Sequence, residues 1–149
     1  MPDLRIQIVS YSQGLMPIQR IRQKVFQEEQ GVSAELEFDG KDETAQHLLA
    51  YLDKIAVGTL RIRRLDSESA KIERLAVLPE ARGKGIGKAL MKQALREIEE
   101  QGFHQAVLNA QVYIQPLYET LGFEVVGDRF QEAGILHVKM VKTLVRNKE

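Results

Sequence analysis

The segment Arg82-Gly83-Lys84-Gly85-Ile86-Gly87-Lys88 combines glycines with basic side chains, between a predicted strand and a predicted helix. Glycine lets backbone N–H groups approach a ligand closely, and the first turn of a helix offers unpaired N–H donors at the positive end of its dipole. The three cations of the segment attract negative charge as well. This composition therefore favours the binding of a phosphate or pyrophosphate group.

The spacing of this segment does not match the two best-known phosphate-binding loops. The loop that binds ATP or GTP needs a Ser or Thr after Gly-Lys, but Ala89 follows Gly87-Lys88, and Arg82 stands where its first glycine would be. The dinucleotide pattern needs a glycine three residues after Gly85, where Lys88 stands. We therefore expect a different phosphate-bearing ligand.

The charges of the helix predicted over 84–101 oppose its dipole, with bases at the start and acids at the end. Each exposed adverse charge costs about 0.3–1 kcal/mol. A bound pyrophosphate would reverse the sign at the amino end, and the alternative is a helix that tolerates adverse surface charges. The charges are Arg82, Lys84 and Lys88 at the start and Glu97, Glu99 and Glu100 at the end.

The apolar pattern predicts the elements that position this segment. Alternation with polar residues indicates strands, and apolar residues every three or four positions indicate helices. The order β, α, three β, α, β, α, β, β predicts an α+β fold in one domain, 1–149, with a frayed end over 144–149. The predicted strands are 4–8, 46–52, 55–65, 71–78, 106–111, 123–130 and 135–144, the helices are 18–31, 84–101 and 114–121, and 32–44 is a loop with one helical turn.

The composition excludes several classes of protein. The 149 residues carry 21 bases and 21 acids, so the large basic excess of a nucleic-acid binder is absent. The chain has no Cys, which removes disulfides, thiolate nucleophiles and zinc–thiolate sites, and the three scattered histidines do not predict a metal site. The longest apolar run, 48–52, is far short of the roughly 20 residues that span a bilayer, and no secretory signal is recognisable. We expect no membrane association and a cytoplasmic location.

Two segments of the chain resemble motifs of the GCN5-related N-acetyltransferase (GNAT) family. The segment 75–90, LAVLPEARGKGIGKAL, is similar to the acetyl-CoA motif, whose core Arg/Gln-x-x-Gly-x-Gly/Ala is filled by Arg82, Gly85 and Gly87. The segment 117–123, LYETLGF, is similar to the second family motif. The segments 25–30, 39–47 and 132–137 resemble the ElaA-like branch of the family.

The resemblance implies the GNAT fold, with a mixed, mostly antiparallel sheet and flanking helices, and acetyl-CoA as cosubstrate. The backbone of Leu75, Ala76 and Val77 would pair with the pantetheine arm, and Gln111 stands where many members have an Asn that contacts this arm. The amides of the glycine-rich turn would hold the pyrophosphate; these belong to Gly83, Lys84, Gly85, Ile86, Gly87 and Lys88.

The implied reaction is direct transfer of an acetyl group to an amine in a ternary complex, with no acyl-enzyme. Tyr118 is the candidate acid, because a phenol with a pKa of about 10 is protonated at neutral pH and can donate to the departing thiolate. Glu73 is a candidate base, since it precedes the cofactor-pairing segment and shares a strand face with Leu75 and Val77. His137 is a weaker candidate, because a lone strand histidine is more often a structural residue.

The acceptor is predicted to be a primary amine of a small molecule. A peptide or protein acceptor, or a non-catalytic module that binds acyl-CoA, remains as an alternative, and the chain could be a monomer or a homodimer. Seven acids against one base over 28–43 suggest a cationic acceptor, although a solvated acidic loop explains them equally well.

Overall fold

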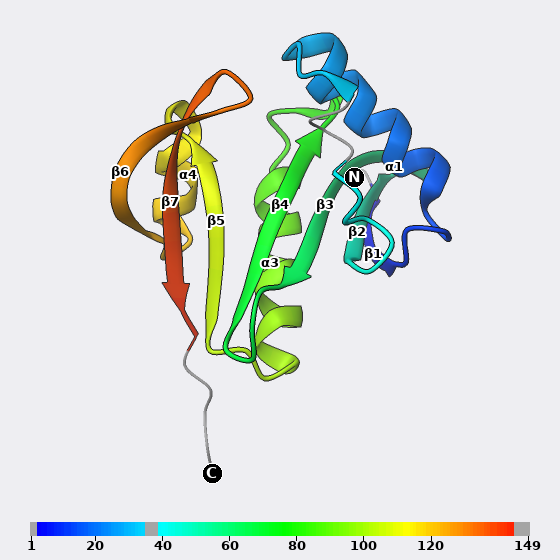
Figure 1. The fold of residues 1–149 in the computed structure, drawn as a ribbon. Coiled ribbons are helices and arrows are strands. Elements are labelled where there is room, and N and C mark those ends of the chain that lie inside the picture. Colours follow the sequence, from blue (N-terminus) through cyan, green and yellow to red (C-terminus); the bar gives the residue numbers. More distant parts are fainter. Residues whose placement is uncertain (1–2, 35–38, 145–149) are drawn as a thin grey trace.

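The computed structural model describes residues 3–34 and 39–144, which form one seven-stranded sheet in the order β1-β2-β3-β4-β5-β7-β6 (Figure 1). Five of the neighbouring pairs are antiparallel and β4–β5 is parallel, which confirms the predicted α+β class. The strands are β1 Leu4–Val9, β2 Gln46–Leu52, β3 Ile55–Arg64, β4 Ser69–Val77, β5 Gln105–Gln111, β6 Glu124–Glu132 and β7 Ile135–Thr143. The helices are α1 Leu15–Arg22, α3 Ile86–Glu100 and α4 Gln115–Thr120, with η1 Gln23–Glu29, η2 Pro79–Ala81 and η3 Val112–Ile114 between strands.

Helices α1 and α3 cover opposite faces of strands β2 to β4. A Cβ placed on Gly58 would lie 3.0 Å from Leu90 of α3, whereas the side chain of Leu49 lies beside Ile18 of α1, at Gly14. Gly58 is opposite Ala50 in the register, and adjacent residues of a strand point to opposite faces. The middle of the sheet is therefore buried on both faces, and the face toward α1 carries the charged residues described below.

Strands β4 and β5 are paired over a short distance and then diverge (Figure 1). Within the described residues their pairing ends at Lys71 and Val107. The backbone φ of Arg74 is +56°, and the β3–β4 register skips at this point, so that Arg74 and Leu75 stand opposite one residue of β3. This β-bulge increases the local twist and turns the end of β4 away from β5.

The predicted helix 18–31 consists of two parts. Helix α1 passes into the π-helix η1, in which Gln30 N–H donates to the carbonyl of Val25 at 3.1 Å. The wider π turn shifts the side chains that follow it, and such turns are frequent at functional sites. An apolar period cannot distinguish a π turn from an α turn, so the sequence predicted one continuous helix.

The other boundaries follow the prediction closely. The hairpin at Asp53 and Lys54 is confirmed, with φ of 48° and 72°, which are the left-handed values of a type I′ turn. Ala133 and Gly134 form a similar turn between β6 and β7, with φ of 52° and 76°. Residues 35–38 of the predicted loop, including any helical turn there, and residues 145–149 of the end predicted to be frayed over 144–149 lie outside the described residues. Over 3–34 and 39–144, no helix is long and apolar enough to cross a membrane.

Candidate functional site

A cleft of about 960 Å³ lies between the diverging strands β4 and β5. Its walls are the end of β4, the glycine-rich turn and start of α3 on one side, and β5, α4 and the β6–β7 turn on the other. The candidate catalytic residues Tyr118, Glu73 and His137 all line it. So do all the residues predicted to bind a cofactor except Lys84, namely Leu75, Ala76, Val77, Arg82, Gly83, Gly85, Ile86, Gly87, Lys88 and Gln111.

The glycine-rich turn presents backbone donors to this cleft. Gly83 and Gly85 both have a φ of +78°, which glycine adopts without strain, and Gly85 is the residue at which α3 begins. The first turn of α3 has neither an acidic residue nor a side-chain cap. Apart from their immediate chain neighbours, no atom of the described residues lies within 4 Å of a Cβ placed on Gly83 or Gly85. The start of α3 is therefore an open, electropositive position that suits a pyrophosphate.

Two consecutive residues at the end of η1 contact both walls of the cleft. Glu29 binds the guanidinium of Arg82 through two bonds of 2.5 and 2.6 Å, and Arg82 also donates to the carbonyl of Val77 at 3.0 Å. On the other wall, the side-chain amide of Gln111 donates to Gln30 at 3.1 Å. Segment η1 thus supplies a carboxylate next to the glycine-rich turn, and the hydrogen bonds from Arg82 lower the pKa of Glu29.

Tyr118 projects from α4 into the wall of the cleft. Its side chain is buried and its ring packs edge-on against Phe123, with 6.1 Å between the ring centroids. Burial raises the pKa of Tyr118 to about 12, so the phenol holds its proton at every pH at which the protein would work. The residue can donate a proton and cannot serve as a base at neutral pH.

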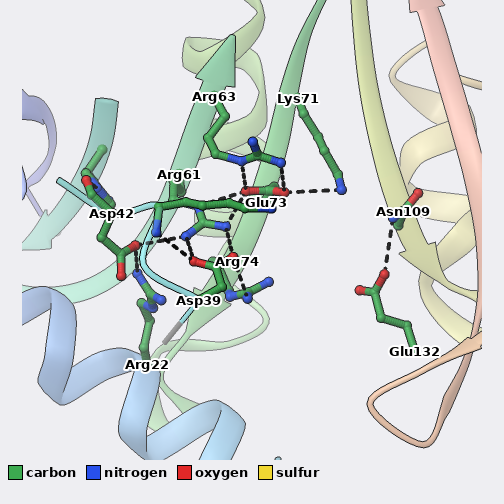
Figure 2. A network of polar contacts seen from close by, with 12 residues as sticks. Arg22, Asp39, Asp42, Arg61, Arg63, Lys71, Glu73, Arg74, Asn109 and Glu132 are labelled. Carbon is green, nitrogen blue, oxygen red and sulfur yellow. Dashed lines mark hydrogen bonds and ion pairs between the residues drawn. The ribbon is translucent and has the colours of Figure 1, made fainter. Parts of the chain in front are cut away.

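A network of ion pairs covers the face of β3 and β4 that faces α1 (Figure 2). At its centre is Arg61, whose side chain is fully buried. Arg61 binds Asp39 through two hydrogen bonds of 2.8 and 2.9 Å, Asp42 at 3.0 Å and Glu73 at 2.8 Å. Asp42 also binds Arg22 of α1 at 2.7 Å. The network connects α1, the segment after residue 38 and the central strands.

Glu73 is one of the network residues that line the cleft. It accepts hydrogen bonds from Arg63 at 2.9 and 3.1 Å and pairs with Lys71 at 3.2 Å, in addition to Arg61. Burial raises the pKa of Glu73, but the hydrogen bonds from Arg63 and the nearby charges of Arg61 and Lys71 outweigh this effect and hold the pKa at about 2. A carboxylate with so low a pKa is a weak proton acceptor. The bulge at Arg74 also interrupts the alternation that predicted one strand face for Glu73 and Leu75.

His137 lies on the opposite wall, and its ring is held in one tautomer. Its Nδ1 is 2.7 Å from the carbonyl oxygen of Ile135, which can only accept, so Nδ1 carries a proton. In the neutral ring Nε2 is then the proton acceptor, and it lies 3.9 Å from a carboxylate oxygen of Glu132. Asn109 donates to the other oxygen of Glu132 at 3.2 Å (Figure 2). His47, in contrast, is buried against the backbone carbonyl of Asp42, and burial lowers its pKa.

Beyond the cofactor motif, the sequence identified Glu73 and His137 as candidate site residues but not the charged and polar groups that bind them. Arg61 and Arg63 alternate with apolar residues on a central strand, which was a signal that their face meets other charged groups. Nothing in the sequence indicated that Asn109 of β5 and Glu132 at the end of β6 would meet, since β7 lies between these two strands in the sheet. The acids of 28–43 were interpreted as a possible attractive rim, yet three of the five described members, Glu29, Asp39 and Asp42, are bound to arginines. Within 3–34 and 39–144, no group of His, Asp and Glu side chains is arranged to hold a metal ion.

The chain as a whole is similar to known proteins. Residues 10–144 match the family model described as an acetyltransferase (GNAT) domain. The uncharacterised N-acetyltransferase YjcF of Bacillus subtilis is 35% identical over 123 residues, which cover 82% of this chain and 87% of that protein. Protein ElaA of Escherichia coli is 30% identical over 149 residues, 97% of this chain and 96% of ElaA.

Solved structures agree with the sequence comparison. The crystal structure of E. coli ElaA aligns with a TM-score of 0.84 and 27% identity, covering 94% of this chain and 99% of that one. An acyl-CoA N-acyltransferase from Pseudomonas aeruginosa aligns with a TM-score of 0.83 and 28% identity, with the same coverage. In both cases the alignment includes nearly the whole chain.

Proposed function

Because the chain belongs to the GNAT family of N-acetyltransferases, which transfer acyl groups from acyl-CoA, we propose that it acetylates a primary amine of a small molecule. The transfer is direct, in a ternary complex of protein, acetyl-CoA and amine. The observation that supports this most is the cleft itself, which brings a phosphate-binding turn, a buried phenol and a polar wall into one cavity.

The residues on the β4 side of the cleft fit the CoA part of the cosubstrate. The amides of Gly83, Gly85 and the first turn of α3 suit the pyrophosphate, with Lys88 nearby as a cation. The backbone of 75–77, which faces the cleft beyond the last β4–β5 pair, suits the amide-containing pantetheine arm as an added strand. The bound cosubstrate supplies an acyl thioester, a carbonyl carbon already activated for attack.

Glu29 is expected to compete with the pyrophosphate for this position. Replacement of Glu29 by Gln removes a negative charge beside the turn and frees Arg82, so CoA should bind about fivefold more tightly, equivalent to roughly 1 kcal/mol. Calorimetric titration with CoA measures the change. Glu28→Gln is the matched control, since Glu28 pairs with Lys24 and does not line the cleft. Weaker CoA binding by Glu29→Gln would instead indicate that Glu29 orients Arg82 for binding the pyrophosphate.

Proton transfer requires one acceptor and one donor in the cleft. We assign the donor to Tyr118, whose phenol is protonated and buried, and the acceptor to Nε2 of His137. Nε2 takes the proton of the acceptor ammonium, and the carboxylate of Glu132 stabilises the resulting imidazolium. As the new C–N bond forms and the C–S bond breaks, the phenol of Tyr118 protonates the departing thiolate. The nitrogen then loses its second proton, which restores the phenol of Tyr118, and the imidazolium of His137 releases its proton to solvent. Glu73, the first choice from sequence, is less suited because three cations bind its carboxylate.

Replacement of His137 by Gln should lower kcat by about 10²-fold, at the lower end of the range for loss of a general base, because Glu132 remains near the amine. Initial rates of thiol release over a range of pH measure the effect, which should be smallest at high pH, where the free amine is already abundant. His104→Gln is the control, since His104 is exposed and does not line the cleft. An unchanged kcat at neutral pH would return the role of base to Glu73 or to a water molecule.

The decisive experiment for the proposed function combines two measurements on the intact protein. Thiol release from acetyl-CoA is followed with a panel of small amines, amino acids, polyamines and peptides, and thermal stability is measured with and without CoA. Turnover of a small amine supports the proposal. A thermal shift with CoA but no turnover would indicate a CoA-binding module, and turnover of peptides alone would indicate a protein acetyltransferase.

A further inference from the structure

The β3–β4 wall of the cleft places two cations directly opposite each other. Arg63 and Lys71 are a cross-strand pair in the β3–β4 register, and both line the cleft with about a fifth of each side chain exposed. Like charges in this position repel and destabilise a sheet. Glu73 lies between them and binds both, which explains how the pair is tolerated.

The carboxylate of Glu73 does not neutralise all the positive charge around it. Glu73 also binds Arg61, which is itself bound through two hydrogen bonds to Asp39. Among the described residues, the network as a whole carries five positive charges and three negative ones; its cations are Arg22, Arg61, Arg63, Lys71 and Arg74, and its anions are Asp39, Asp42 and Glu73. The excess positive charge reaches the cleft through Arg63, Lys71 and Arg74, each about a fifth exposed, whereas Arg22 and Arg61 are buried. The partly exposed Asp39 is bound by Arg61 and Arg74.

Arg63 and Lys71 also have hydrogen-bond donors that none of the described residues uses. Glu73 occupies Nε and Nη2 of Arg63, and among the described residues no acceptor binds Nη1. The ammonium of Lys71 has three donors and one protein partner within this part of the chain, Glu73. An anionic group in the cleft would find unused donors from both side chains, and the planar guanidinium suits a carboxylate.

The pKa values on this wall agree with a positive potential. The hydrogen bonds from Arg61 lower the pKa of Asp39, and the pKa of Glu73 stays low although burial opposes this. Arg74, on the same wall, has its pKa lowered, first by burial and then by the charge of Arg61. An additional negative charge would therefore be stabilised there.

The opposite wall has the complementary charge. Glu132, half-exposed and held by Asn109, faces the cleft next to His137, across from Lys71 and Glu73 (Figure 2). A molecule with a negative group toward Arg63 and Lys71 would place a positive group toward Glu132. His137, which we assigned to deprotonate the amine, is on that side.

We propose that the acceptor is an amino acid or similar small zwitterion, whose carboxylate binds Arg63 and Lys71 while its amine lies at Glu132 and His137. This inference rests on the proposed function and specifies its substrate class. The acidic segment 28–43 suggested a cationic acceptor, but Glu29, Asp39 and Asp42, three of its five described acids, are bound to arginines, which weakens the argument for that choice.

The test uses pairs of acceptors that differ by one carboxylate: L-leucine with isoamylamine, L-phenylalanine with 2-phenylethylamine, and 4-aminobutanoate with butylamine. We expect kcat/KM for the acid to exceed that for the matched amine, and Lys71→Met to lower this acid-to-amine ratio about tenfold. Lys139→Met is the control, because Lys139 is an exposed strand lysine that does not line the cleft; it should leave the ratio unchanged. An aminoalkylphosphonate in the same assay distinguishes a carboxylate site from a phosphonate site.

A second measurement separates this inference from the proposed function. Calorimetric titration with N-acetyl-L-leucine and with its neutral amide, in the presence of CoA, reports recognition of the carboxylate without turnover. Tighter binding of the acid, lost in Lys71→Met, supports the carboxylate site even if no acceptor is acetylated, in which case the proposed function alone fails. Equal binding of acid and amide, or a preference for the neutral amine in the kinetic pairs, would overturn the inference while leaving the acetyltransferase intact.

Discussion

Replacement of Tyr118 by phenylalanine is expected to lower kcat by about 10²–10⁴-fold with little change in the affinity for CoA. The range is that of losing a positioned general acid. The hydroxyl is the one atom removed, and it lies on a buried ring that lines the cleft at the start of the second family motif. Without it, the thiolate must leave unprotonated or wait for a proton from water.

The geometry makes this substitution a clean test. Among the described residues the Tyr118 hydroxyl has no hydrogen-bond partner, and the edge-on packing against Phe123 needs only the ring. The free energy of unfolding should therefore change by less than about 1 kcal/mol, and a thermal melt can verify that the fold is intact. Tyr113→Phe is the matched control, because Tyr113 also lines the cleft but is exposed at 75%.

Three measurements decide the outcome. Thiol release at saturating acetyl-CoA gives kcat, calorimetry with CoA gives the affinity, and thermal unfolding reports the stability. A fall in kcat with an unchanged dissociation constant supports the acid role. An unchanged kcat would remove Tyr118 from the mechanism, and a parallel loss of CoA affinity and stability would make it a structural residue.

The cofactor side of the cleft was predictable because it depends on local chemistry. Gly83 and Gly85 are needed for their left-handed backbone, and the start of α3 follows from the apolar stripe behind it. These features lie within twenty consecutive residues, so their spacing in the sequence is enough to predict that they lie close together in the structure. The order of strands and helices along the chain was predicted correctly for the same reason, since each strand alternates or is apolar in its own segment.

The acceptor side could not be predicted in the same way. The partners Arg61, Asp39 and Glu73 are separated by up to 34 positions in the chain, and the ion pairs exist because the β3–β4 register and the segment after residue 38 bring them together. When only neighbouring positions in the chain are considered, each of these three side chains is expected to be a solvated surface charge. The bulge at Arg74 is equally hidden, because a positive φ at an arginine has no compositional signal. The choice of Glu73 as base came from an alternation that this bulge interrupts.

Replacement of Arg61 by Met is expected to destabilise the protein by about 3–5 kcal/mol, the usual loss when one member of a buried ion pair is removed. Arg61 is fully buried, and its removal leaves Asp39 and Glu73 with fewer partners in a site from which water is largely excluded. Urea unfolding at about pH 7 measures the loss. Arg5→Met is the control, because the Arg5–Asp3 pair is exposed and worth at most about 1 kcal/mol.

The pH dependence of stability distinguishes loss of the ion pairs from a simple packing defect. The pKa of Glu73 is about 2 in the folded protein, below its ordinary value of 4.5, so its stabilising contribution is complete above pH 4.5 and is lost as the pH falls toward 2. Without Arg61 the folded-state pKa of Glu73 moves up toward that ordinary value. The slope of stability between about pH 4.5 and 2 should therefore become smaller in Arg61→Met than in the natural protein, and Arg61→Lys, which keeps the charge but not the forked hydrogen bonds, should lie between them. An Arg61→Met protein that loses stability but keeps the full acid slope would show that Arg61 acts by filling space, with Arg63 and Lys71 sufficient to hold Glu73 ionised.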